Sequence, residues 1–337
     1  MKIAVDAMGG DFAPLEVVRG AVAAARAGEA EILLVGEPGA IEAVGAEAGL
    51  PCPGVEVVAA RERVAMGEHP AEALRHKKDS SLAVGARLVK EGRAGALVSA
   101  GNTGAAMAFS LFTLGRLPGV ERPAIAAPFP TTRGFAVLID AGANVEVKPH
   151  YLLQFAQMGS LYAASVLKRA HPRVGLLNVG AESGKGTPVL QEACRLLTAS
   201  GLNFIGNIEG RDVPLGAADV IVCDGFSGNV LLKFAEGLAE GLFSLLKQEL
   251  LAGFSTRAGA YLARPALKRL KAKMDYAEYG GAPLLGLKGL TIISHGSSDA
   301  RAIHNAIRAA RESLEQDVVG KIAALAQAAP NDAGSEA

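Results

Sequence analysis

Short apolar runs in this chain repeatedly end in glycine mixed with Asp, Asn, Ser or His, and this repetition constrains the fold more than any other feature. Residues 95–100 (GALVSA) pass into GNTG at 101–104, and a helix-like run, AAMAFSLF, follows. Small side chains leave backbone N–H groups bare, as an incoming anion or polar ligand requires. The same kind of sequence follows six further β-rich runs, at 6–11, 140–144, 178–186, 206–210, 224–229 and 294–298.

Strand-like and helix-like runs alternate along the chain. The strand-like runs are apolar throughout rather than alternately apolar and polar, which is typical of a parallel sheet covered by helices on both faces. We therefore predict an α/β fold with three layers. Strands are expected at 2–7, 31–36, 55–59, 95–100, 135–140, 174–179, 203–208, 219–224 and 290–295. The clearest helices are expected at 15–28, 80–92, 151–170, 188–201 and 300–316.

The polar loops are predicted to lie together. Carboxyl ends of parallel strands meet at one edge of a sheet, and ligands bind in the crevice there. Gly, Asn and Asp are also ordinary turn residues, and this alternative would explain any single loop. It explains the whole set less well, because connections at the opposite strand ends, such as 27–30 and 91–94, are plainer in composition. We therefore expect one ligand-binding rim.

Composition narrows the classes of function. The chain has 337 residues, and its 34 Lys and Arg balance 34 Asp and Glu, so the net charge does not indicate a nucleic-acid partner. Cys52, Cys194 and Cys223 lie too far apart for a disulfide framework or a metal motif. This usage fits the reducing cytoplasm. We expect no metal, no cofactor and no nucleic acid.

An uncharged segment at 94–115 is long enough to suggest a membrane span. It contains four glycines, together with Ser99, Asn102 and Thr103. We interpret it as a buried strand, a polar turn and a buried helix. The amino terminus, MKIAVDAMGGD, reaches Asp6 without a signal-peptide core. The sequence therefore predicts a soluble protein.

The loop NVGAESGKGT resembles a P-loop only in part. Three residues, rather than four, separate Gly180 from Gly184, and Gly186 stands where a P-loop has a hydroxyl residue. Glu182 would also place a negative charge beside a phosphate. ATP or GTP binding is therefore disfavoured, and no G-x-G-x-x-G after the first strand indicates a dinucleotide site. Lys185 is well placed to hold a single phosphate, and the alternative is a solvated surface lysine.

Three other residues near strand ends are candidates for catalytic chemistry. The run GFSGN is not a nucleophile elbow, because glycine directly follows Ser227. Cys223 is conceivable as a nucleophile, but a buried core cysteine is the stronger interpretation. His295 precedes a glycine and two serines. It either contacts a ligand or is an ordinary loop residue.

Two basic clusters are conspicuous. The run RHKK at 75–78 precedes Asp79-Ser80-Ser81, a typical helix cap. The segment 251–274 has no acidic residue and mixes cations with aromatic and aliphatic side chains, which suits an anionic membrane surface or an acidic protein partner. The alternative is a solvated helix at a dimer interface. Its cations are Arg257, Arg264, Lys268, Arg269, Lys271 and Lys273.

Taken together, the motifs resemble those of the bacterial phosphate acyltransferases of phospholipid synthesis (acyl-acyl carrier protein:phosphate acyltransferases). The resemblance covers nearly the whole chain, and the order and spacing of the motifs are highly specific. One departure is Glu146-Val147 before Lys148, where many relatives carry Asp-Cys, so a necessary catalytic cysteine there is ruled out. The motifs are KIAVDAMGGDFAP, KKDSSL, SAGNTGA, GAN, ESGKG, GNIEGRD, DGFSGNVLLK, YGGAPLLGLKG and HGSSDARAIHNAIRAA.

The resemblance implies transfer of a fatty acyl group from its carrier-protein thioester to inorganic phosphate. It implies a three-layer Rossmann-like fold with a parallel or mixed sheet, similar to phosphotransacetylases and isocitrate-dehydrogenase-like enzymes. It also implies a homodimer and a cytoplasmic enzyme attached peripherally to the membrane. The expected organisation is one α/β domain over 1–325, with a helical protrusion at about 235–275, and a flexible tail over 326–337.

This reaction needs hydrogen-bond donors more than it needs a general acid or a general base. Phosphate is already an anion, and a thiolate is a good leaving group. We predict Lys185, Asn229 and His295 as catalytic residues. Two alternatives stay open, a nucleotide-dependent α/β enzyme and a non-catalytic adaptor that binds acyl chains or membranes. Substrate and phosphate binding is predicted for Asn102, Thr103, Gly104, Asn144, Gly184, Gly186, Asp224, Gly225 and Ser227.

Overall fold

We describe residues 1–274 and 280–328 of a computed structural model of the chain, and for 271–274 the backbone alone. The strands described form one 11-stranded sheet in the order β3-β2-β1-β4-β11-β10-β5-β6-β9-β7-β8. All nine predicted strands are confirmed. They are β1 (Lys2–Asp6), β2 (Glu31–Gly36), β3 (Val55–Ala59), β4 (Ala96–Ser99), β6 (Gly134–Ile139), β7 (Val174–Leu177), β8 (Phe204–Ile208), β9 (Val220–Val222) and β11 (Leu290–Ile293).

Two strands were missed, β5 (Ala124–Thr131) and β10 (Ala282–Leu285). They lie side by side in the middle of the sheet and pair antiparallel with each other and with their outer neighbours, β6 and β11. The sequence of β5, AIAAPFPT, carries two prolines, and β10 is only four residues long. Both features weaken the strand signal, because proline cannot donate to a ladder and short runs show no period.

The antiparallel pair corrects one prediction. Strands β1, β2, β3, β4 and β11 run in one direction, and β6, β7, β8 and β9 run in the opposite one. The polar loops therefore form two groups instead of one rim. Neighbouring strands rotate by about 20–25°, so the six steps from β1 to β9 add up to about 120–150°. A twist of this size would turn the strands of the second group toward the direction of the first, so we expect the carboxyl ends of the two groups to approach each other.

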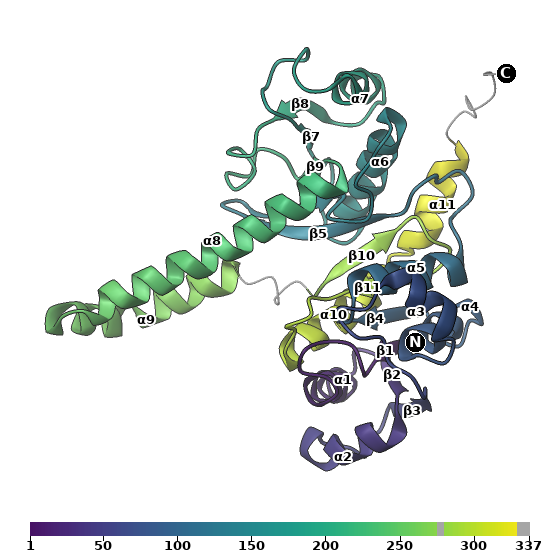
Figure 1. Ribbon diagram of the computed structural model, residues 1–337. Helices are drawn as coiled ribbons and strands as arrows, with labels where there is room; N and C mark the ends of the chain where they lie inside the picture. Colours follow the sequence, from purple (N-terminus) through teal and green to yellow (C-terminus); the bar gives the residue numbers. More distant parts are fainter. Residues whose placement is uncertain (275–279, 329–337) are drawn as a thin grey trace.

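Helices cover both faces of the sheet, which confirms the predicted three layers (Figure 1). On the first group of strands, one face packs against α1 (Leu15–Arg26) and α10 (Ala300–Glu315). The other face packs against α4 (Ser81–Lys90) and α5 (Thr103–Leu114). The remaining helices are α2 (Pro38–Ala48), α3 (Pro70–His76), α6 (Pro149–Ser165), α7 (Pro188–Thr198), α8 (Gly225–Leu251), α9 (Phe254–Met274) and α11 (Val318–Ala328).

The uncharged segment 94–115 folds as predicted. Strand β4 is buried, the turn at 100–102 follows it, and α5 packs its buried residues into the core. Across residues 1–274 and 280–328, no helix combines the length and the apolar character that crossing a bilayer would take. The segment therefore contributes one buried strand of the sheet and one helix that packs into the core.

Helices α8 and α9 form an antiparallel hairpin that projects from the body as a long arm (Figure 1). The 27 residues of α8 correspond to a length of about 40 Å. The protrusion was predicted at about 235–275, whereas α8 already begins at Gly225, α9 ends at Met274, and residue 275 lies outside the described residues. At the other end of the chain, α11 continues to Ala328, three residues into the predicted tail, and 329–337 lie outside the described residues.

Candidate active site

The loops after β1, β4 and β11 form the first rim, which comprises residues 6–11, 99–104 and 294–298. The hydroxyl of Ser99 donates to the buried carboxylate of Asp6 at 2.7 Å. The Asp11 amide donates to the Gly296 carbonyl, and the Ser294 amide to the Ser99 carbonyl, both at 2.8 Å. Burial raises the pKa of Asp6, and the Ser81 and Ser99 hydroxyls oppose this rise. The first rim is thus held together by its own polar groups.

Asn102 uses its side chain to hold this rim in place. Its Oδ1 accepts from the Ala105 amide at 2.9 Å and caps α5. Its Nδ2 donates to the carbonyls of Met66 and Glu68, at 2.8 and 2.9 Å. Gly104 lies so close to α3 that an added Cβ would stand 2.7 Å from Pro70 Cγ. Both residues therefore fasten the 66–70 segment to the rim, while Thr103 is exposed. Their role in binding substrate stays a prediction.

The loops after β6, β7 and β9 form the second rim, which comprises residues 140–144, 178–186 and 224–229. Asp140 organises its first loop. Its buried carboxylate accepts from the amides of Ile125 and Ala143 at 3.0 Å, from the Asn144 amide at 2.6 Å and from Asn144 Nδ2 at 2.8 Å. Burial raises the pKa of Asp140, and these donors oppose the rise. Asn144 is thereby fixed in position.

The amino terminus of α8 lies flush against this loop. Asp224 accepts from the Ser227 amide at 2.8 Å and from the Ser227 hydroxyl at 2.7 Å, so it caps the helix and orients its first turn. The Gly225 amide donates to the Asn144 carbonyl at 2.7 Å. Asn229 lies beside Gly142, with its Cβ and Cγ 3.7 Å from the position of an added Cβ there. The structure therefore brings Asn144, Asp224, Gly225, Ser227 and Asn229 together.

Lys185 lies in the loop after β7, which is the strand next to β9. Its backbone is held by Asn178, whose Nδ2 donates to the Lys185 carbonyl at 3.1 Å. Gly186 has φ +85° and packs against the Asn178 side chain, so no other residue fits there easily. The Lys185 side chain is exposed, and it makes no ion pair with any residue in the described part of the chain. An ordered loop thus presents an available ammonium group.

Gly184 completes the local geometry of this loop. Gln191 on α7 donates from Nε2 to the carbonyls of Gly184 and Gly186, at 2.8 and 3.2 Å. Space around Gly184 is open, since an added Cβ would meet nothing within 4 Å among the described residues. An anion could therefore approach the backbone at this point.

His295 on the first rim lies close to the arm. Its Nδ1 accepts from the Ser297 amide at 3.2 Å and lies 2.7 Å from the Ser297 hydroxyl. A neutral His295 therefore carries its proton on Nε2. Glu236, in α8, is half-buried, and burial raises its pKa while the charge of His295 partly lowers it. The arm helix, which starts at the second rim, thus reaches the first rim.

Cys223 is a core residue, as the sequence indicated. It is 1% exposed, and its Sγ contacts the Asp140 carbonyl at 3.5 Å. Burial and the charges of Asp140 and Asp224 raise the pKa of Cys223 well above that of an ordinary thiol. Because only the thiolate is a good nucleophile, Cys223 is unsuited to covalent catalysis.

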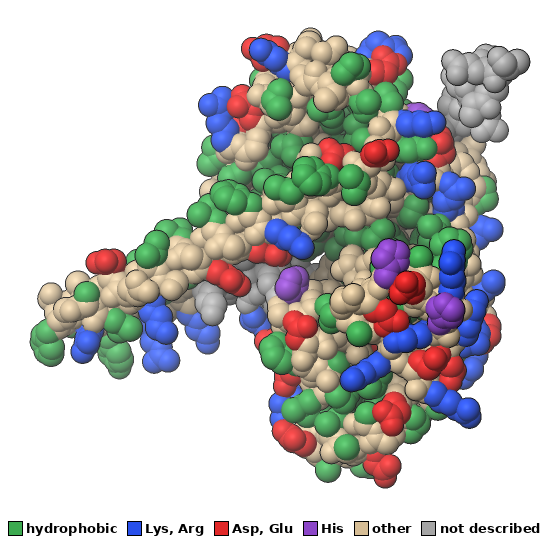
Figure 2. Space-filling view, in the orientation of Figure 1, with side chains coloured by type: hydrophobic (Ala, Val, Ile, Leu, Met, Phe, Trp, Pro, Cys, Tyr) green, Lys and Arg blue, Asp and Glu red, His purple; other side chains and the backbone are tan. Residues whose placement is uncertain are grey.

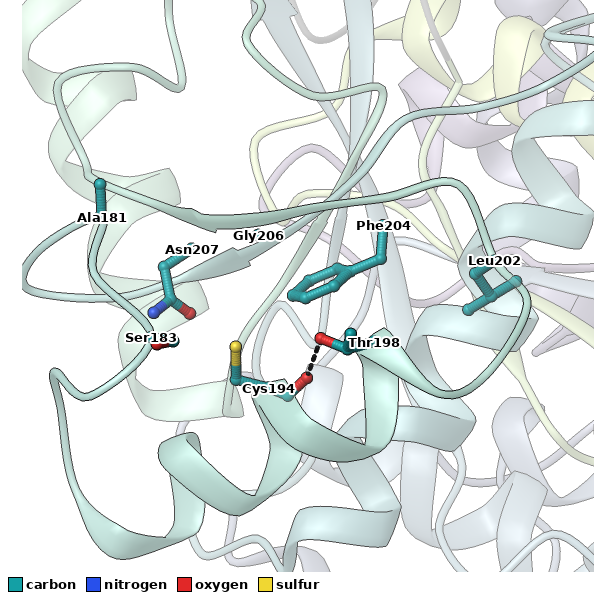
Figure 3. Close-up of a pocket in the computed structure, with 8 residues that line it drawn as sticks. All are labelled: Ala181, Ser183, Cys194, Thr198, Leu202, Phe204, Gly206 and Asn207. Atoms are coloured by element: carbon teal, nitrogen blue, oxygen red, sulfur yellow. Dashed lines mark hydrogen bonds between the residues drawn. The ribbon is translucent and has the colours of Figure 1, made fainter.

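A cavity of about 260 Å³ lies beside the Lys185 loop, between that loop, α7 and β8 (Figure 3). Its walls are Ala181, Ser183, Cys194, Thr198, Leu202, Phe204, Gly206 and Asn207. None of the predicted site residues lines this cavity. Sequence reasoning missed two organising acids, Asp6 and Asp140. The available signal was an acidic residue as the last position of an apolar strand.

The second rim has the chemistry of an anion site. The Asn229 amide, the Lys185 ammonium and the amino terminus of a long helix lie on neighbouring strand ends. Asn144 lies beside them and shapes the site, because its Nδ2 already donates to the Asp140 carboxylate and to the Pro123 carbonyl. Helix amino termini and lysines favour negative charge, and neutral amides donate hydrogen bonds without repelling it. Such a surface can hold a small oxyanion and stabilise negative charge that develops next to it.

The sequence matches known proteins over nearly its whole length. The model of a family described as "Fatty acid synthesis protein" matches residues 1–321. A phosphate acyltransferase from Heliobacterium modesticaldum is 55% identical over 323 residues, covering 96% of this chain and 96% of that protein. One from Desulfitobacterium hafniense is 53% identical, with the same coverage.

Among solved structures, a phosphotransacetylase from Streptococcus pyogenes matches with a TM-score of 0.64 and 20% sequence identity, covering 94% of each chain. At this identity the likeness concerns the fold alone, and it confirms the predicted similarity in fold to phosphotransacetylases. The identity to the curated relatives is far higher and extends over nearly the full length of both chains. The chain therefore belongs to the family of bacterial phosphate acyltransferases.

Proposed function

We propose that this protein transfers a fatty acyl group from the thioester of an acyl carrier protein to inorganic phosphate, and so supplies acyl phosphate for phospholipid synthesis. The observation that carries the proposal is the second rim, where Lys185, Asn144, Asn229 and the amino terminus of α8 lie on neighbouring strand ends. Membership of a phosphate acyltransferase family supports the reaction class.

In the proposed reaction a phosphate oxygen attacks the carbonyl carbon of the thioester. A C–O bond forms, the C–S bond breaks, and the carrier leaves as a thiolate that takes a proton from water. The Lys185 ammonium holds phosphate or the developing oxyanion, and the Asn229 amide donates to the oxyanion. Asn144 shapes the phosphate site. His295 is a further polar contact from the first rim. The step requires no cofactor.

The proposal predicts that acyl carrier protein thioester and phosphate, mixed with the enzyme and no nucleotide, yield an acyl phosphate. Hydroxylamine traps acyl phosphates as hydroxamates, and the product should depend on both substrates. A requirement for ATP or NAD(P) would favour a nucleotide-dependent enzyme instead. Binding of acyl chains without any turnover would favour a non-catalytic adaptor.

The arm is assigned to the membrane and to a second copy of the chain. On α9, exposed aromatic and aliphatic residues such as Phe254 (93%) and Leu262 (80%) accompany exposed cations, a mixture that suits an anionic lipid surface. Figure 2 shows hydrophobic side chains along one side of the arm and Lys and Arg along the other. The apolar side of α8 is assigned to the homodimer contact, and its exposed members are Phe226, Val230, Phe234, Leu238, Leu242 and Leu245.

The assignment of α9 to lipid can be tested with vesicles. Replacing the four exposed cations by glutamine should weaken binding to phosphatidylglycerol vesicles by at least about a hundredfold, because each basic residue near an anionic surface contributes about 1 kcal/mol. These cations are Arg257, Arg264, Lys268 and Arg269. Lys271 and Lys273 also belong to the predicted set, but their side chains lie outside the described residues.

Two controls accompany the vesicle experiment. Raising the salt concentration should weaken binding of the unaltered protein and change the glutamine variant little. The variant should also stay dimeric in sedimentation, because the dimer contact is assigned to α8. Unchanged vesicle binding would remove the membrane assignment, and a monomer at micromolar concentration in the unaltered protein would remove the homodimer.

A further inference from the structure

A second exposed basic surface lies on the body of the protein, around α3. Arg61, Arg63, Arg75 and Lys78 are exposed, and none of them forms an ion pair with another residue within 1–274 or 280–328. We call these four residues the α3 patch. Their positive charges are therefore available to a partner.

The acids of the same segment are mostly used internally. Glu62 accepts from the Asp79 amide at 3.0 Å, and Asp79 accepts from the Arg61 amide at 3.3 Å. Glu68 binds the Lys77 ammonium at 2.6 Å, which lowers the pKa of Glu68. Glu72 is the exposed acid of α3 itself. The fold thus turns three carboxylates toward its own backbone and ammonium groups while the cations of the α3 patch face solvent.

The residues of the α3 patch flank the segment 66–70, and this segment contacts the first rim. The segment before α3 holds Asn102 through the carbonyls of Met66 and Glu68. The same Met66 extends over the next loop, with its Cε 2.7 Å from the position of an added Cβ on Gly296. One short segment therefore touches both the loop after β4 and the loop that carries His295. A partner bound to the α3 patch would lie at the edge of the candidate site.

We propose that the α3 patch docks the acidic carrier protein that delivers the acyl thioester, an inference that rests on the proposed function. A protein that carries its thioester on a flexible prosthetic arm must bind near the reacting groups. Complementary charge steers such an encounter and fixes its orientation. The α3 patch is cationic, and the segment that it flanks contacts the first-rim loop that carries His295, the residue through which the first rim enters the proposed reaction.

The exposed surface around α3 suits a protein better than a lipid bilayer. Over residues 61–78, Met66 is the exposed large apolar side chain, whereas α9 exposes Phe254, Tyr261 and Leu262. Membrane-surface helices need an apolar face that enters the bilayer as well as cations. In addition, the far end of α8 lies about 40 Å from its amino terminus at the second rim. Each basic surface is therefore assigned to one partner: the α3 patch binds the carrier protein, and α9 binds the membrane.

The test compares two charge reversals of equal size. The patch variant is Arg75→Glu/Lys78→Glu. The control is Lys90→Glu/Arg93→Glu, whose residues are also exposed and three positions apart but lie at the opposite end of β4. We expect the patch variant to raise KM for acyl carrier protein thioester by about tenfold or more at low salt, with little change in kcat. The control should stay within about twofold of the unaltered protein.

A small thioester substrate distinguishes an effect on carrier docking from an effect on the chemical step. With acyl-pantetheine as donor, the patch variant should keep the kcat/KM of the unaltered protein, because this donor has no protein surface to dock. Equal losses with both donors, or an equal KM rise in the control, would overturn the proposal. A patch variant that lost binding to anionic vesicles would reassign the surface to lipid.

The proposed docking can also be measured without turnover. Carrier protein should bind the unaltered enzyme and the control more tightly than the patch variant in a titration. Should no thioester react with phosphate, the proposed function fails while this binding difference still decides the docking surface. Equal carrier binding by all three proteins overturns the docking proposal alone.

Discussion

Lys185→Ala and Asn229→Ala should each lower the turnover number for acyl phosphate formation by about a hundredfold to a thousandfold, which is the usual effect of removing one preorganised oxyanion donor. Asn178 and Gln191 hold the backbone of the loop that carries Lys185, so this loop presents the exposed Lys185 side chain at the second rim before substrate binds. Asn229 is fixed by the contact of α8 with the 140–144 loop. Preorganisation of this kind is what makes a donor effective in a transition state.

The two variants should differ in their dependence on phosphate. Lys185→Ala removes a positive charge and should also raise KM for phosphate, whereas Asn229→Ala removes a neutral donor and should act mainly on kcat. Lys247→Ala and Asn203→Ala are matched controls at exposed positions outside both rims. Steady-state kinetics with the hydroxylamine assay gives all of these quantities. Near-normal turnover in both folded variants would show that the roles assigned to Lys185 and Asn229 are wrong.

The sequence predicts those strands that are recognisable from their own residues. Each parallel strand is a continuous apolar run that ends in polar residues, and all nine were found. The middle of the sheet was missed, because β5 contains two prolines, β10 has only four residues, and the two strands pair with each other although they are far apart in the chain. Without this pair, the sequence could not indicate that the strands reverse direction, and one rim was predicted in place of two.

For the site residues too, the sequence indicates which residue types are present but not the roles that depend on contacts in the folded chain. Asp224 is predicted to bind substrate or phosphate, and in the structure its carboxylate caps α8. Asn102 was expected in an anion cradle, but its side chain binds the carbonyls of Met66 and Glu68, residues that are over thirty positions away. Asp140 was overlooked although it holds Asn144. A residue type shows which hydrogen bonds it can make, whereas the partner that uses them depends on tertiary contacts.

Gly228→Ala should destabilise the protein by about 3 kcal/mol or more and also lower turnover, because the site has no room for a methyl group. Gly228 is buried where α8 meets the 140–144 loop. An added Cβ would collide with the Asp140 carbonyl oxygen and stand 2.9 Å from Cys223 Sγ. The carbonyl belongs to the backbone at the end of β6, so it cannot rotate away as a flexible side chain could. The helix would have to shift instead.

That shift carries a second consequence, because Asn229 is the next residue along the helix. We expect Gly228→Ala to lower the apparent Tm and, in the fraction that stays folded, to lower kcat through displacement of the Asn229 amide. Gly259→Ala in α9 is the matched control, since an added Cβ there meets nothing within 4 Å among the described residues. It should leave kcat unchanged and stabilise its helix by up to about 1 kcal/mol. Thermal unfolding followed by circular dichroism, combined with the hydroxylamine assay, measures both effects. If Gly228→Ala matched Gly259→Ala in stability and turnover, α8 would not dock on the Asp140 loop as described, and the placement of Asn229 in the site would lose its physical basis.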